Sequence, residues 1–192
     1  MWKRSTLAWL ALLALLVSAC GSAEPKEERD DRPYGSQIAV VERIVDADTV
    51  VLDVKEPGDV LGSGPGQEIQ LREMDAPEAP SAGLPPECWG AEAARFAEGV
   101  LPTGSTVYVM PEGQPGADGK ITAYVWLESG VLYNELAVRE GQARAVPQIF
   151  VERLRVAETE AKTANRGMWG PPCDYDATPP PPGVPAPAAP KA

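Results

Sequence analysis

Histidine is absent from the 192 residues, and this absence excludes whole classes of chemistry. Without an imidazole, the chain has no His-ligated zinc site, no Ser-His-Asp triad and no histidine general acid or base. The three cysteines have no CxxC spacing and form neither a disulfide scaffold nor a structural zinc site. Basic residues are also few, with 17 Lys and Arg against 28 Asp and Glu and a formal net charge of −11. This charge argues against a protein that coats nucleic acid, because phosphate contacts need a basic face.

The beginning of the chain is typical of a secretion signal. Lys3 and Arg4 precede an apolar run over residues 7–17, which is too short to span a bilayer. The run ends in Val-Ser-Ala followed by Cys20, which resembles the lipobox of bacterial lipoproteins. In such proteins the cysteine is diacylated after cleavage, and two acyl chains make a stable membrane anchor. We therefore predict a signal peptide over residues 1–19, lipidation of Cys20 and an extracytoplasmic, lipid-anchored protein. The alternative is an ordinary cleavage site with an incidental cysteine.

Composition separates one folded region from two flanking segments. Residues 20–35 are charged and contain no apolar run, which is typical of a solvated linker. Residues 174–192 are rich in proline, a composition that favours extended polyproline II and a disordered tail over a packed core. The residues between them, 36–173, have the length of one ordinary domain.

Hydropathy within this region predicts five short strands and three helices. The strands are expected within residues 38–54, on both sides of a turn at 46–48, and over 68–72, 105–110 and 120–127. The helices are expected over residues 91–100, 131–141 and 150–165. The last helix has an apolar residue at every third or fourth position, and Glu158 and Lys162 form an i,i+4 pair on its outer side. Together these elements indicate an α+β fold built on a small five-stranded OB-type barrel.

Short sequence strings then occur in a fixed order. The main ones are DADTV at residues 46–50, after the first strand, and LREMDAPE at residues 71–78, at the end of the third. They are followed by EAA at 92–94, AYV at 123–125, NEL at 134–136 and AE…AK…GMW between 157 and 169. This set resembles the thermonuclease (micrococcal nuclease) family over about residues 36–170. The resemblance implies an OB-fold barrel with three helices that uses calcium to cleave phosphodiesters of DNA and RNA.

The resemblance also assigns roles to individual residues. Asp48 and Asp75 would bind calcium through their carboxylates and Ala76 through its carbonyl oxygen. Glu78 would be the general base, or the group that orients the attacking water. On the residues alone, the alternative is that the two aspartates only form turns. The presence of three acids at family positions favours a calcium site.

Two positions depart from the family pattern. Gln70 stands five residues before Asp75, and Lys120 three residues before Ala123, where the family has arginines. A guanidinium binds two phosphate oxygens at once, whereas glutamine donates one neutral hydrogen bond and lysine supplies a point charge. Arg72 lies on the same strand face as Gln70, roughly 7 Å further along. The family's substrate-binding tyrosines are also replaced, by Asp118, Pro147 and Ile149.

Three functions remain open at this point. We expect a monomeric, surface-anchored, calcium-dependent nuclease that is weak because both arginines are replaced; nucleic acid is disfavoured as a partner by the acidic charge. The alternatives are a non-catalytic OB-fold binding module on the cell surface and a hydrolase of smaller phosphoesters. Finally, thiols outside the membrane are oxidised, and similar positions are paired in some secreted relatives, which implies a Cys88–Cys173 disulfide; two free thiols are the alternative.

Overall fold

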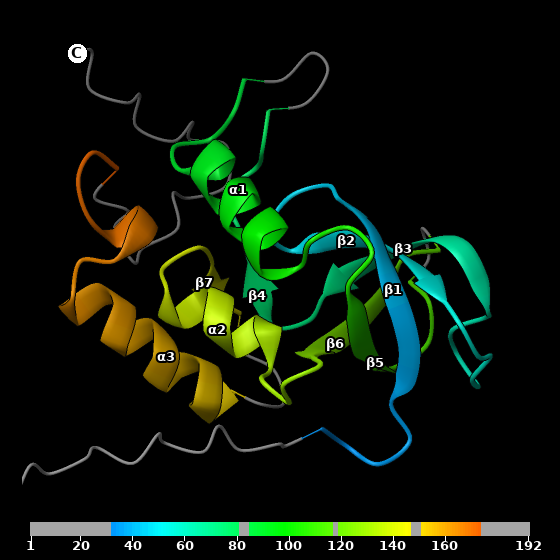
Figure 1. The fold of residues 1–192 in the computed structure, drawn as a ribbon. Helices are drawn as coiled ribbons and strands as arrows, with labels where there is room; N and C mark the ends of the chain where they lie inside the picture. The colour runs from blue at the N-terminus through cyan, green and yellow to red at the C-terminus, as the bar shows by residue number, and fades with distance from the viewer. Residues whose placement is uncertain (1–31, 81–84, 117–118, 147–150, 174–192) are drawn as a thin grey trace, which may run out of the picture.

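The computed structural model describes residues 32–80, 85–116, 119–146 and 151–173 (Figure 1). The predicted signal peptide, Cys20 and most of the predicted linker lie outside these ranges, as does the segment from residue 174 onward. Asp118, Pro147 and Ile149 also lie outside them. Within the described ranges, no helix is both long enough and apolar enough to cross a membrane.

Five strands of the described chain close into a barrel, in the order β1-β2-β3-β6-β5. They are β1 (Gln37–Ile44), β2 (Thr49–Val54), β3 (Gly64–Leu71), β5 (Thr106–Pro111) and β6 (Ile121–Leu127). Neighbouring strands are antiparallel, apart from the parallel pair β3–β6. This barrel, together with three α-helices in the same ranges, confirms the predicted α+β fold of the OB type.

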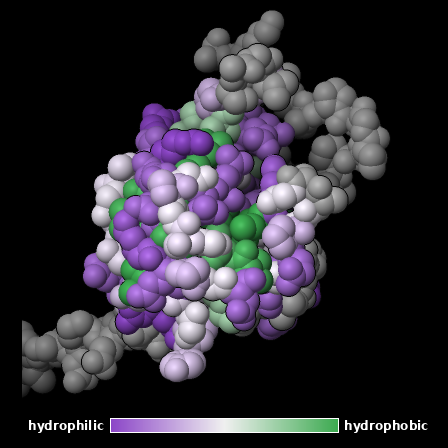
Figure 2. Space-filling model, turned by 90° about the vertical axis from the view of Figure 1, so that its right-hand side faces the viewer, coloured by the Kyte–Doolittle hydropathy of each residue, from purple (hydrophilic) through white to green (hydrophobic). Residues whose placement is uncertain are grey.

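Alternation along the strands directs apolar side chains into the barrel and polar ones outward. In β3, Ile69 and Leu71 are buried in the core while Gln70 between them is exposed. Gln70 pairs with Thr122 of β6, which has the buried Ala123 as its neighbour. Figure 2 shows that the barrel face at the right of Figure 1 is largely hydrophilic, with small hydrophobic areas between polar residues. Because its side chain is exposed, Gln70 lies on the outer surface of the barrel, where a phosphate could reach it.

The helices lie to one side of the barrel (Figure 1). They are α1 (Gly90–Val100), α2 (Tyr133–Arg139) and α3 (Val151–Thr163), and a short 3-10 helix, η1 (Gly167–Trp169), follows. The apolar positions of α3 predicted to face the core are buried at Leu154, Ala157 and Ala161. Helix α2 packs against both β6 and α3, so it connects the barrel to the last helix.

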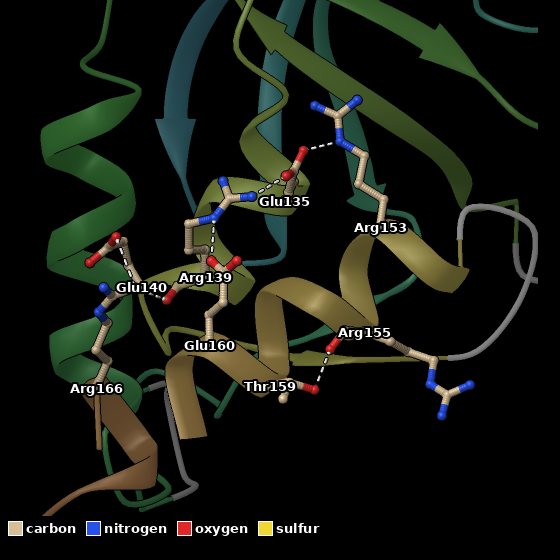
Figure 3. Close-up of polar contacts among 8 residues, drawn as sticks. All are labelled: Glu135, Arg139, Glu140, Arg153, Arg155, Thr159, Glu160 and Arg166. Carbon is tan, nitrogen blue, oxygen red and sulfur yellow. Dashed lines mark hydrogen bonds and ion pairs between the residues drawn. The ribbon is translucent and has the colours of Figure 1, made fainter. Parts of the chain in front are cut away.

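A network of ion pairs joins α2 to α3 (Figure 3). The Glu135 carboxylate, only 10% exposed, accepts hydrogen bonds from Arg139 on its own helix and from Arg153 on α3. Arg139 also donates from Nε to Glu160 on α3, over 3.1 Å. A nearly buried carboxylate held by two guanidinium groups has its charge compensated on both sides. The network therefore holds α3 against α2, the helix that precedes β7 in the chain.

The structure differs from the hydropathy-based expectation in two places. Strand β3 begins at Gly64, four residues before the expected start, because Gly64 pairs with Val54 even though its surroundings are rich in Gly and Pro. A second, two-stranded sheet is formed by β4 (Met74–Asp75) and β7 (Arg144–Ala145). Strands of two residues have no hydropathy period, so the pattern does not indicate them. This small sheet aligns Asp75 with Arg144.

Cys88 and Cys173 form a disulfide, with their Cα atoms 5.8 Å apart, which confirms the implied pairing. The bond joins the segment before α1 to the segment after η1. Trp89, the next residue, donates from Nε1 to Oε1 of Gln142 over 2.9 Å. The start of α1 is thus tied to two later parts of the chain: the segment after η1, through the disulfide, and the segment between α2 and β7, through Gln142.

Candidate functional site

The turn between β1 and β2 holds the first predicted calcium ligand. The Asp48 N–H donates to Oδ1 of Asp46 over 3.1 Å, and the N–H of Val45 donates to the Thr49 carbonyl over 2.9 Å. The Tyr133 hydroxyl, from α2, donates to the carbonyl of Ala47 over 3.0 Å. Asp46 thus has the turn-forming role that an Asx side chain often has. Hydrogen bonds within the turn and from α2 hold its backbone, and they thereby fix the position of the Asp48 carboxylate.

Asp48 connects this turn to the end of β4. Its Oδ2 accepts the backbone N–H of Ala76 over 2.8 Å, and its Oδ1 accepts the Thr49 hydroxyl over 2.9 Å. The side chain is nearly buried, with the residue 7% exposed. Burial, and secondarily a hydrogen bond with Asp46, raise the pKa of Asp48 to about 7. The structure therefore brings together Asp48 and Ala76, which are 28 residues apart.

Asp75, the last residue of β4 and the neighbour of Ala76, lies directly opposite Arg144 of β7. Nε of Arg144 donates to Oδ2 of Asp75 over 2.6 Å, and an Nη nitrogen contacts the same oxygen. The two side chains are 35% and 42% exposed for Arg144 and Asp75, respectively. The second predicted calcium ligand therefore already has a cationic partner from its own chain.

The chemistry of these groups fits calcium, which binds carboxylate and carbonyl oxygens. The Asp48 carboxylate is nearly buried and its ionisation is opposed by its surroundings, a situation that a bound divalent cation relieves. Within the described ranges, no three acidic or cysteine side chains gather closely enough to hold a metal by themselves. A calcium ion would therefore be held by Asp48, Asp75 and the carbonyl of Ala76, with water completing its coordination.

Glu78, the predicted general base, follows at the start of the next segment and is exposed. Its backbone N–H donates to Oε2 of Glu87 over 3.3 Å, and its carbonyl accepts the N–H of Glu87 over 3.1 Å. A Cβ at Gly90 would collide with this carbonyl, so the glycine permits the close approach of α1. Partial desolvation, then the charges of Asp46, Glu87 and Asp75, raise the pKa of Glu78, while Lys120 opposes the change. A carboxylate with a raised pKa is a stronger base.

Gln70 and Lys120, which replace the family arginines, both lie near these acids. Gln70 pairs with Thr49, the residue after Asp48, and is exposed. Lys120 directly precedes β6, and its positive charge acts on Glu78. Both positions therefore lie on the side of the barrel that carries Asp48 and Glu78, which we call its acidic side.

Arg72 does not take over the position of Gln70. Its Nη1 donates to the Thr122 hydroxyl over 3.2 Å, and its backbone N–H donates to the Ala123 carbonyl over 2.9 Å. The guanidinium thus binds Thr122 of β6, and Arg72 itself lies just after β3, which ends at Leu71.

Arg144 and Glu87 are the residues near the site that sequence reasoning misses. Neither belongs to one of the recognisable strings. Arg144 reaches Asp75 only through the two-residue pairing of β4 and β7, and Glu87 reaches Glu78 only because the chain folds back before α1. No sequence pattern indicates that a basic residue a few positions after a helix, such as Arg144, will contact Asp75.

A closed five-stranded barrel with one acidic group in the β1–β2 turn and another at the end of β4 defines the class: an OB fold with a candidate cation site. The model of the family described as staphylococcal nuclease homologue matches residues 68–171, and the chain belongs to this family. The match contains Asp75, Ala76, Glu78 and Lys120, whereas Asp48 precedes it. A search of curated proteins finds no match to this chain.

Proposed function

We propose that the protein is a calcium-dependent phosphodiesterase of DNA or RNA whose activity is low because Gln70 and Lys120 replace two arginines. The observation that carries the proposal is the contact between Asp48 and Ala76, which joins the two predicted calcium-binding segments. Bound calcium would supply positive charge to a phosphate oxygen. Glu78, with its raised pKa, would accept a proton from the attacking water.

Cleavage of a fluorescently labelled single-stranded DNA by the purified protein tests this function. We expect slow cleavage in calcium that stops when a chelator is added. Asp75→Asn should abolish it, because a carboxylate ligand is lost. Asp59→Asn, which changes an exposed aspartate of the β2–β3 loop, is the matched control and should retain the wild-type rate. Calcium binding without any turnover would contradict the proposal and identify a non-catalytic binding module instead.

We also propose that the mature chain is anchored to the outer face of the cell membrane through Cys20. The support is the short apolar run that ends in Val-Ser-Ala before this cysteine. In cells fed a labelled fatty acid, wild-type protein and Ser22→Ala should take up label, whereas Cys20→Ala should not. Cys20→Ala should also be released from the membrane fraction or remain unprocessed. Wild-type protein without label would show that the anchor is wrong.

A further inference from the structure

The pair Arg144–Asp75 joins a flexible cationic side chain to a proposed calcium ligand. Arg144 has a rigid base: Ala145, beside it in β7, donates its N–H to Oε1 of Glu158 over 3.1 Å. The next residue, Val146, donates its N–H to the Glu73 carbonyl over 2.8 Å. The backbone of β7 is thus held by α3 and by the chain before β4. The Arg144 side chain, by contrast, is 35% exposed and extends to a carboxylate that is itself 42% exposed.

The Asp75 carboxylate therefore has two competing uses. Its Oδ2 accepts from both Nε and an Nη nitrogen of Arg144, and the same group is a proposed ligand of calcium. Ion pairs this exposed are weak, because solvent screens them and both side chains lose rotational freedom. A divalent cation can therefore take Asp75 from the guanidinium without unfolding the small sheet.

A guanidinium released in this way remains close to the bound cation. Any two oxygen ligands of one calcium ion lie within about 5 Å of each other, because each Ca–O distance is about 2.3–2.6 Å. A phosphate oxygen bound to the same ion would therefore lie within about 5 Å of the carboxylate group that the Arg144 side chain already contacts. The planar fork of Arg144 can bind two such oxygens, which Gln70 and Lys120 cannot do.

We propose that Arg144 is a phosphate-binding residue of this site, which contacts Asp75 without calcium and the substrate phosphate once calcium has taken Asp75. This assignment rests on the proposed function. Arg144, in β7, would supply the bidentate guanidinium group that is missing at Gln70 and Lys120. The assignment also predicts effects of opposite sign on two binding reactions, which a purely structural role does not produce.

The experiment compares Arg144→Gln with Arg95→Gln in otherwise unchanged protein. Arg95 is the matched control: it is an arginine on α1, 67% exposed and paired with Glu92, and its replacement causes the same change in net charge. Calorimetric titration with calcium alone should show that Arg144→Gln binds the ion at least about threefold more tightly than wild type, because the competing guanidinium is gone. Arg95→Gln should bind it as wild type does.

The second measurement is calcium-dependent binding of a phosphorothioate-linked oligothymidylate, which resists cleavage, by fluorescence anisotropy. Arg144→Gln should bind it at least about tenfold more weakly, the loss expected for one charge-assisted contact. Arg144→Lys should lie between wild type and Arg144→Gln, because it keeps the charge and loses the fork. If Arg144→Gln does not fold, Arg144→Lys is measured in both assays and should show the same signs.

If Arg144→Gln shows tighter calcium binding without weaker oligonucleotide binding, or the reverse, the proposed exchange of partners by Arg144 is wrong. A fall in both affinities also overturns it, because it indicates a distorted site. Wild-type protein that binds calcium, with Arg144→Gln unchanged in both measurements, overturns this inference alone. Wild-type protein that binds no calcium overturns the proposed function, and this inference with it.

Discussion

Gln70→Arg combined with Lys120→Arg should raise calcium-dependent DNA cleavage by at least about tenfold, the equivalent of roughly 1.4 kcal/mol of activation barrier. Gln70 is exposed and pairs with Thr49 beside the Asp48 turn, and Lys120 acts electrostatically on Glu78, so both new guanidinium groups would be on the acidic side of the barrel. A transition-state arginine in other phosphoryl-transfer enzymes contributes on the order of 10³–10⁵ in rate. We expect a smaller rate increase here because, in our proposal, Arg144 already supplies one guanidinium group to the phosphate.

The matched control is Gln67→Arg combined with Lys55→Arg, which makes the same residue changes further along the β2–β3 pair: Gln67 pairs with Leu52, and Lys55 directly follows β2. This control separates local phosphate binding from a general reduction of the acidic charge, and should leave the rate within about twofold of wild type. Adding Asp75→Ala to the active double variant should remove the gain. If the folded, calcium-binding double variant shows no gain, the acidic surface or the replaced tyrosines limit the activity, and the role given to the two positions is wrong.

The fold is predictable from the sequence because most of its elements have a local signal. Ile69, Gln70 and Leu71 alternate as a half-buried strand does, and each takes the expected side of β3. Glu158 and Lys162, four residues apart on α3, form the expected ion pair at 2.8 Å. In each case the interacting residues are close in the chain or follow a fixed period, so the pattern alone determines which side chains share a face.

The candidate site is less predictable, because several of its contacts depend on tertiary packing. The resemblance places Asp48 and Asp75 in the same site, and the Ala76 contact shows that their segments do meet. The resemblance does not indicate Arg144, whose contact depends on two-residue strands. Nor does it indicate that Arg153 binds Glu135, 18 residues earlier, because this pair needs the observed packing of α3 on α2. Such contacts have no sequence period.

Asp48→Asn should make the calcium-free protein more stable at pH 8, by up to roughly 4 kcal/mol, and should weaken calcium binding. Burial raises the pKa of Asp48 from its ordinary 3.8 to about 7, and this difference corresponds to roughly 4 kcal/mol of ionisation free energy. Between these two pH values the folded protein retains a proton that the unfolded chain has lost. Its stability therefore falls as the pH rises from about 4 to about 7, and the loss is complete above pH 7.

An asparagine at position 48 resembles the protonated carboxyl group, because its oxygen can still accept the Ala76 N–H and its amide can donate to Asp46, with which the Asp48 side chain shares a hydrogen bond. Urea denaturation with a chelator present, at pH 5 and pH 8, measures the effect: the variant should exceed wild type in stability by clearly less at pH 5 than at pH 8, because only part of the wild-type loss has occurred at pH 5. Asp59→Asn, at an exposed position, should follow the wild-type pH dependence. A variant that is less stable than wild type at pH 8 would show that the carboxylate serves the fold. Gained stability with lost calcium affinity would instead show that the chain keeps an unfavourable buried charge for the sake of the cation.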